Sequence, residues 1–101
     1  MSLFRKDFPI FTAHPELVFL DSASSSQKPK MVIDAITNYL ENSYSNIHRG
    51  AYELSEISEE FFEQSKHTIA KAIGATSAYE ILYTAHATSA ANLLTGMLGS
   101  S

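Results

Sequence analysis

Residues 80–94, EILYTAHATSAANLL, change character halfway along their length. Residues 81–83 form a short apolar run with the length and composition of a buried strand. Residues 90–94 are rich in alanine and leucine, which are strong helix formers. Apart from His86, residues 84–89 between them have small or hydroxyl-bearing side chains. The stretch therefore predicts a strand that leads through a tight junction into a helix.

The predicted junction is chemically suited to an anion. The first N–H groups of a helix have no partner within the helix, and the helix dipole adds partial positive charge there, so a phosphate is a fitting ligand. Thr88 or Ser89 is expected either to cap the helix or to turn its hydroxyl onto a phosphate oxygen. The stretch has no glycine-rich phosphate fingerprint, so both interpretations stay open at this point.

Composition narrows the class of protein. The 101 residues make one domain at most, and 45% of them are hydrophobic, which is enough to build a core. A formal charge of −4 without a basic block argues against a nucleic-acid partner. No apolar run approaches the roughly 18 residues that span a bilayer, and the first residues do not resemble a signal peptide. We therefore expect a cytoplasmic protein with no membrane partner.

The absence of cysteine excludes disulfides, thiolate metal sites and a cysteine nucleophile within these residues. The acidic side chains of residues 53–63 are expected to form a solvated helix surface rather than a metal site.

Helical patterns dominate the remainder of the chain. A helix is predicted from Pro29 to about residue 42 and a longer one over residues 52–73, ended by Gly74. Residues 3–8 are expected to form a helical turn that Pro9 stops. Residues 17–20 read as a second short strand. The inward stripe of the long helix is predicted to comprise Leu54, Ile57, Phe61, Ile69, Ala72 and Ile73. The predicted fold is thus helix-rich α/β, with three main helices and two short strands.

Six short segments together carry a family resemblance. They are FRKDFPIF at 4–11, LDSASSSQKP at 20–29, VIDA at 32–35, NIHRGAYELS at 46–55, GATSAYEILYT at 74–84 and ATSAANLL at 87–94. In this order they resemble the N-terminal portion of a Suf-type cysteine desulfurase, a class V aminotransferase-like enzyme of pyridoxal-phosphate fold type I. The resemblance implies that residues 1–79 form the arm and helices of a small domain and dimer interface. Residues 80–101 then form the first strand and helix of the large cofactor domain.

The resemblance also implies site residues. The matching threonine of the family bonds the phosphate of pyridoxal 5'-phosphate, so the expected cofactor-binding residues are Ala87, Thr88 and Ser89. The expected substrate-binding residues are Ala23, in the loop after Asp21, and His48 and Arg49, near the active site and dimer interface. An arginine such as Arg49 suits the carboxylate of an amino acid. The implied partners are the remainder of the enzyme or a second subunit of a homodimer, and a sulfur-acceptor protein.

The junction departs from the family pattern, and the departures at residues 86 and 89 bear on the phosphate. The family has Arg-Gly-Thr-Thr-Glu or Ser-Gly-Ala-Thr-Glu where this chain has AHATS at residues 85–89. His86 replaces the glycine, so its side chain is expected either to crowd a phosphate or to add a charge to it. Ser89 replaces the acid.

The resemblance further implies groups that these residues do not include. They are the lysine that forms the internal aldimine, an aspartate and a stacked ring for the pyridine, and the cysteine that takes sulfur as persulfide. None of the chain's lysines lies in a segment resembling that of the catalytic lysine; they are Lys6, Lys28, Lys30, Lys66 and Lys71. We therefore expect a fragment of a desulfurase that converts L-cysteine to L-alanine for iron–sulfur cluster assembly, inactive alone and without catalytic residues of its own. Two alternatives remain: a non-catalytic helical module that docks on a desulfurase or sulfur acceptor, and a fragment of a related selenocysteine lyase or class V aminotransferase.

Overall fold

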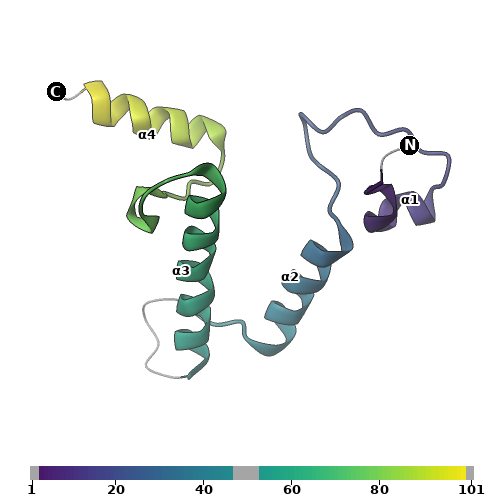
Figure 1. Ribbon diagram of the computed structural model, residues 1–101, viewed down its shortest axis with the longest axis horizontal. Coiled ribbons are helices and arrows are strands. Elements are labelled where there is room, and N and C mark those ends of the chain that lie inside the picture. The colour runs from purple at the N-terminus through teal and green to yellow at the C-terminus, as the bar shows by residue number, and fades with distance from the viewer. Residues whose placement is uncertain (1–2, 47–52, 100–101) are drawn as a thin grey trace. The chain divides into compact units, whose positions relative to one another are not determined.

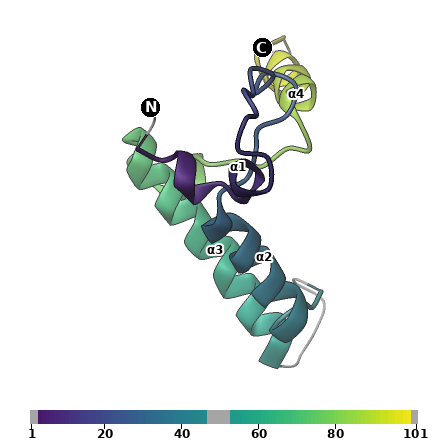
Figure 2. The same cartoon turned by 90° about the vertical axis from the view of Figure 1, so that its right-hand side faces the viewer.

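The computed structural model describes residues 3–46 and 53–99 (Figure 1). Their helices divide between two compact units, Met1–Ser58 and Glu59–Ser101, and each unit is described on its own. The first contains the 3₁₀ turn η1 (Arg5–Asp7), helix α1 (Pro9–Ala13) and helix α2 (Lys30–Asn42). The second contains the 3₁₀ turn η2 (Ala78–Glu80) and helix α4 (Ala87–Gly99). Helix α3 (Glu53–Ile73) is uninterrupted in both views and carries the boundary between the units (Figures 1 and 2).

The helix-rich part of the predicted fold is confirmed, whereas the two strands are wrong. Residues 17–20 and 81–83 form no strand in the part of the chain that the structure describes. The backbone at Ile81 is nevertheless extended, with φ −100° and ψ 120°. A strand needs a neighbouring strand to complete its ladder of hydrogen bonds, and neither segment has such a ladder. The predicted division at residues 79 and 80 concerns the domains of a whole enzyme and stays a prediction.

Pro9 begins the short helix α1 directly after the turn η1 has ended. It occupies the first turn of α1, and Phe8 before it is extended, with φ −107° and ψ 108°. Proline disfavours helical geometry in the preceding residue but suits the first helical position, where its missing N–H costs nothing. The helical turn expected within residues 3–8 is present as η1, which ends at Asp7 before the proline. The short helix α1 that follows was not predicted.

Arg5 ties this N-terminal region together. Its Nη2 donates hydrogen bonds to the carbonyl oxygens of Pro15, at 3.0 Å, and Leu17, at 2.9 Å. The guanidinium also lies 4.0 Å from the centroid of the Phe11 ring, within range of a cation–π interaction. One side chain thus joins η1, α1 and the segment that follows α1.

Replacing Arg5 with lysine should loosen this region, because an ammonium cannot reproduce the planar, multiply donating and ring-stacking geometry of a guanidinium. We expect a loss of about 1.5 kcal/mol in the local opening free energy of residues 13–19. Limited proteolysis of this segment measures the change, with Lys6→Arg, at an exposed neighbouring position, as the matched control. Equal cleavage rates in the two variants would refute the role assigned to Arg5.

Hydrogen bonds of side chains and backbone link α2 and the segment after it to the start of α3. The Tyr39 hydroxyl donates to Ser58 Oγ at 2.9 Å, and Ser58 Oγ donates to the Ser43 carbonyl at 3.1 Å. Ser55 donates to the carbonyl of Asn46 and is also buried. Because serines are small, neighbouring backbone can approach α3 closely here, and the hydroxyls satisfy the carbonyls that this approach buries.

The predicted inward stripe of α3 is wrong. Most of its large members are exposed, namely Leu54, Phe61, Ile69 and Ile73, whereas Ile57 is half-buried. The residues of α3 that are buried are small: Ser55 and Ser58 lie in the first unit and Ala70 in the second.

The helix end is confirmed: Gly74 has φ 76°, and the Ala75 N–H donates to the Ala70 carbonyl at 2.9 Å, as in a Schellman cap. None of the helices within residues 3–46 and 53–99 is long and apolar enough to cross a membrane.

In the second unit, the extended segment before α4 is fixed to α3 by Tyr83. Its ring meets that of Phe62 edge-on, with centroids 5.4 Å apart, and its hydroxyl shares a 2.6 Å hydrogen bond with Ser65 Oγ. The Lys66 Nζ lies 4.8 Å from the Phe62 ring centroid and 5.9 Å from that of Tyr83. Ile81, two residues earlier, is buried. These contacts set where the chain turns into α4.

Candidate functional site at the start of α4

Helix α4 is capped by His86, one residue before its first turn. The His86 carbonyl accepts the Ala90 N–H at 3.1 Å, which is the first hydrogen bond of the helix. The same carbonyl accepts the Thr84 hydroxyl at 3.1 Å. The backbone of His86 is therefore held by donors from both sides of the junction.

The imidazole of His86 completes the cap. Its Nδ1 accepts the Ser89 N–H at 3.1 Å, which is the bond that an N-cap side chain makes to the third residue of a helix. This bond requires an unprotonated Nδ1, so the neutral ring carries its proton on Nε2. The prediction that Thr88 or Ser89 caps the helix is wrong, because the helix begins at Ala87 and both residues lie inside its first turn.

The remaining groups of the first turn form a set of donors that suits a phosphate. At the start of a helix the N–H groups of Ala87 and Thr88 have no carbonyl to bond within the helix. Ala87 and Thr88 are both exposed, and Ser89 is half-buried. Two N–H groups and the Thr88 hydroxyl match the several acceptor oxygens of a phosphate, and the dipole of a 13-residue helix favours its charge. The residues present therefore fit a phosphate group, with the Ser89 N–H already engaged by His86.

The structure brings the three predicted cofactor-binding residues together in one helical turn. Ala23 is exposed in a turn of the first unit, in which Ser24 N–H and Ser25 N–H donate to the Asp21 carbonyl at 3.1 and 3.2 Å. The loop after Asp21 thus forms a hydrogen-bonded turn. His48 and Arg49 lie outside the described residues.

Two features of the junction were missed by sequence reasoning. Histidine is not among the preferred N-cap residues, so its position before an alanine-rich helix was a weak signal. Tyr83 was assigned only to an apolar strand, although its hydroxyl is the group that reaches Ser65. Both residues act by fixing the backbone that carries Thr88.

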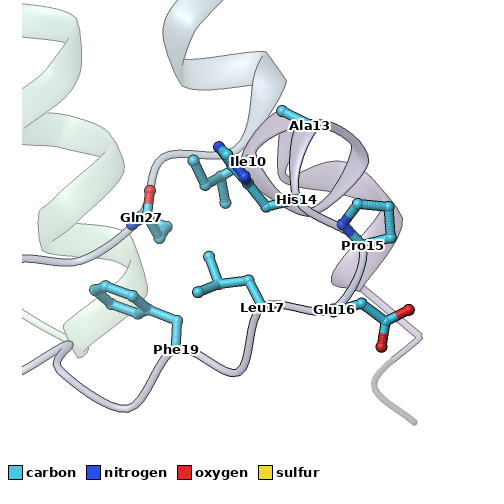
Figure 3. Close-up of a pocket in the computed structure, with 8 residues that line it drawn as sticks. All are labelled: Ile10, Ala13, His14, Pro15, Glu16, Leu17, Phe19 and Gln27. Atoms are coloured by element: carbon cyan, nitrogen blue, oxygen red, sulfur yellow. The ribbon is translucent and has the colours of Figure 1, made fainter.

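A hollow of about 720 Å³ lies in the first unit (Figure 3). Leu17 and Phe19 point toward its centre from the segment after α1, and Ile10 faces them from α1 itself. The Glu16 side chain points away from the others. The lining is therefore mainly an apolar surface, and it contains none of the residues that the sequence singles out for chemistry.

Comparison with known proteins gives consistent matches. A family model described as "Aminotransferase class-V" matches residues 18–101. A protein named "Probable cysteine desulfurase" from Synechocystis sp. is 45% identical over 94 residues, which cover 89% of this chain and 22% of the relative. A protein of the same name from Streptomyces coelicolor is 39% identical over 99 residues, covering 94% of this chain and 24% of the relative.

The fold has a counterpart among solved structures. The apo structure of a cysteine desulfurase from Thermococcus onnurineus matches 71% of this chain with a TM-score of 0.61 and 33% sequence identity. The matched region is 17% of that chain. The chain thus spans less than a quarter of the length of each of these three proteins.

Proposed function

Because the chain belongs to the class V aminotransferase family, we propose that it forms the N-terminal segment of a pyridoxal-phosphate-dependent cysteine desulfurase. The proposed whole enzyme converts L-cysteine to L-alanine and passes the sulfur on as a persulfide, for iron–sulfur cluster assembly. This segment contributes binding and positioning groups to that reaction, and the catalytic lysine and cysteine come from residues that it does not contain.

One observation carries the proposal: the start of α4 presents Thr88 at the place where a helix binds phosphate. The Thr88 hydroxyl and the N–H groups of Ala87 and Thr88 would hold the phosphate of pyridoxal 5'-phosphate, with Ser89 beside them. The bound cofactor would supply an electron sink for the amino-acid substrate. Tyr83 and Ser65 orient this turn by holding the segment that precedes it.

We propose that Ala23, His48 and Arg49 contribute to substrate binding in the whole enzyme. Ala23 would line the approach to the site, and His48 and Arg49 would stand near the substrate, where a guanidinium suits its carboxylate. The rest of the enzyme, a second subunit of a homodimer and a sulfur-acceptor protein are the proposed partners. The large apolar side chains exposed on α2, α3 and α4 support a partner surface of this kind; among them are Met31, Ile36, Ile73, Leu94 and Met97.

A chimera tests the proposal directly. In the Synechocystis relative, the stretch aligned with this chain would be replaced by the residues of this chain, and sulfide and alanine release from L-cysteine would be measured. We expect turnover within about tenfold of the parent, because family members tolerate replaced segments that keep their packing surfaces.

The isolated 101-residue chain, given pyridoxal 5'-phosphate and L-cysteine, should release no sulfide and should lose the cofactor's absorbance on desalting. A folded chimera with only background turnover would contradict the proposal, as would sulfide release by the isolated chain.

A further inference from the structure

We propose that the imidazole of His86 is an internal competitor for the anion-binding end of α4. In the structure, Nδ1 holds the Ser89 N–H, and an oxyanion can use that donor only after the ring has turned away. The inference rests on the proposed function, since it concerns the same turn. It assigns His86 a positioning role that sets how tightly the turn accepts a phosphate.

The competition follows from the number of donors. The Ser89 amide has a single hydrogen to donate. The lone pair of His86 Nδ1 already accepts it, with 3.1 Å between the two nitrogen atoms. A phosphate oxygen that approached the same N–H would meet the ring nitrogen, which in the neutral form offers no hydrogen on that side. The capped helix therefore offers an anion the two N–H groups of Ala87 and Thr88 and the Thr88 hydroxyl, and the uncapped helix offers a third N–H.

The junction allows the ring to leave without disturbing the rest of the turn. The carbonyl of His86 is held independently of its ring by the Thr84 hydroxyl and the Ala90 N–H, each at 3.1 Å. The side chain of His86 is exposed, so it can rotate into water without opening a cavity. The ring is therefore a removable cap on a fixed backbone.

Hydrogen–deuterium exchange with single-residue resolution on the full chain tests the competition. The variants are His86→Gly, which removes the ring, and His86→Asn, whose amide oxygen can make the same cap. His67→Asn, at an exposed position on α3, is the matched control. Each is measured in inorganic phosphate and in sodium chloride of equal ionic strength, and the exchange of Leu94 reports whether α4 is still folded.

We expect the Ser89 amide in chloride to exchange about fivefold faster in His86→Gly than in the unmodified chain, and to stay near the unmodified rate in His86→Asn. Phosphate should slow this exchange in His86→Gly at a concentration at least fivefold lower than in the other three proteins. If phosphate protected the Ser89 amide more strongly in the unmodified chain than in His86→Gly, the inference would be overturned, because His86 would then be a phosphate ligand. Equal phosphate responses in all four proteins would overturn it as well. An active chimera combined with either of these results refutes only the role of His86, whereas an inactive chimera refutes the proposed function.

Discussion

Replacing Ser58 with leucine is expected to lower the free energy of unfolding of the first unit by about 3 kcal/mol. Ser58 is 1% exposed, and its hydroxyl both accepts from Tyr39 and donates to the Ser43 carbonyl. A leucine side chain has no room there and removes both hydrogen bonds, so overpacking and lost bonding act together. Urea unfolding followed by the helical circular dichroism signal measures the change.

Two further variants separate these causes. Ser58→Ala keeps the space and removes the hydroxyl, so it should cost about 1 kcal/mol. Thr68→Leu places the same leucine at an exposed position of α3, where the threonine hydroxyl bonds only within its own helix, to Gln64, and it should change stability by less than about 0.5 kcal/mol. If Ser58→Leu behaved like Thr68→Leu, the hydrogen-bonded contact between α2 and α3 would not exist in solution.

Replacing Tyr83 with alanine should destabilise the second unit by about 2 to 3 kcal/mol. The change removes the edge-on contact with Phe62 and the hydrogen bond to Ser65. It should also release the segment that leads into α4, since Tyr83 is what fixes this segment to α3. Hydrogen exchange of residues 81–90 and urea unfolding together measure the two effects.

The chain provides a matched control for this substitution. Tyr79 is 98% exposed and four residues earlier, whereas Tyr83 is 42% exposed, so Tyr79→Ala should leave stability within about 0.5 kcal/mol of the unmodified chain. Tyr83→Phe keeps the ring pair and should cost about 1 kcal/mol for the lost hydroxyl. Equal effects of alanine at Tyr79 and Tyr83 would show that the aromatic contact does not anchor the junction.

The helices could be predicted from the sequence because their signals are local. The prediction for α2 is confirmed to within one residue at its start, where Pro29 stands just before the first helical residue. Gly74 ends α3 as predicted, since its positive φ is a requirement of the backbone and not of distant partners. Local signals of this kind depend only on residues a few positions apart.

The strands and the packing face of α3 could not be predicted correctly because both depend on what lies beside them. An apolar run such as residues 81–83 becomes a strand only when another strand pairs with it. Large apolar residues recur along α3 at helical spacing, yet the residues of this helix that are buried within the described units are Ser55, Ser58 and Ala70. Periodicity identifies an apolar face but does not say which neighbour is present to cover it.

The sequence predicted where the three candidate residues lie in the fold, and their role in binding a cofactor stays a prediction. The sequence located the turn with Ala87, Thr88 and Ser89, and the structure confirms that they share the first turn of α4. The residue that caps the helix was predicted wrongly, because histidine is not among the residues that commonly occupy the N-cap position. The roles of Ala23, His48 and Arg49 at the substrate stay predictions.

The central claim is that Thr88 at the start of α4 holds a cofactor phosphate, and it is tested most directly by cofactor retention in the chimera. Thr88→Val removes the hydroxyl at nearly constant volume, and Thr95→Val does the same farther along α4, where the hydroxyl donates to the Ala91 carbonyl at 2.9 Å. Equilibrium dialysis against pyridoxal 5'-phosphate should show affinity weakened at least about tenfold by Thr88→Val and unchanged by Thr95→Val, because a hydrogen bond to a charged group is lost only in the first. Equal affinities for the two variants would contradict the claim.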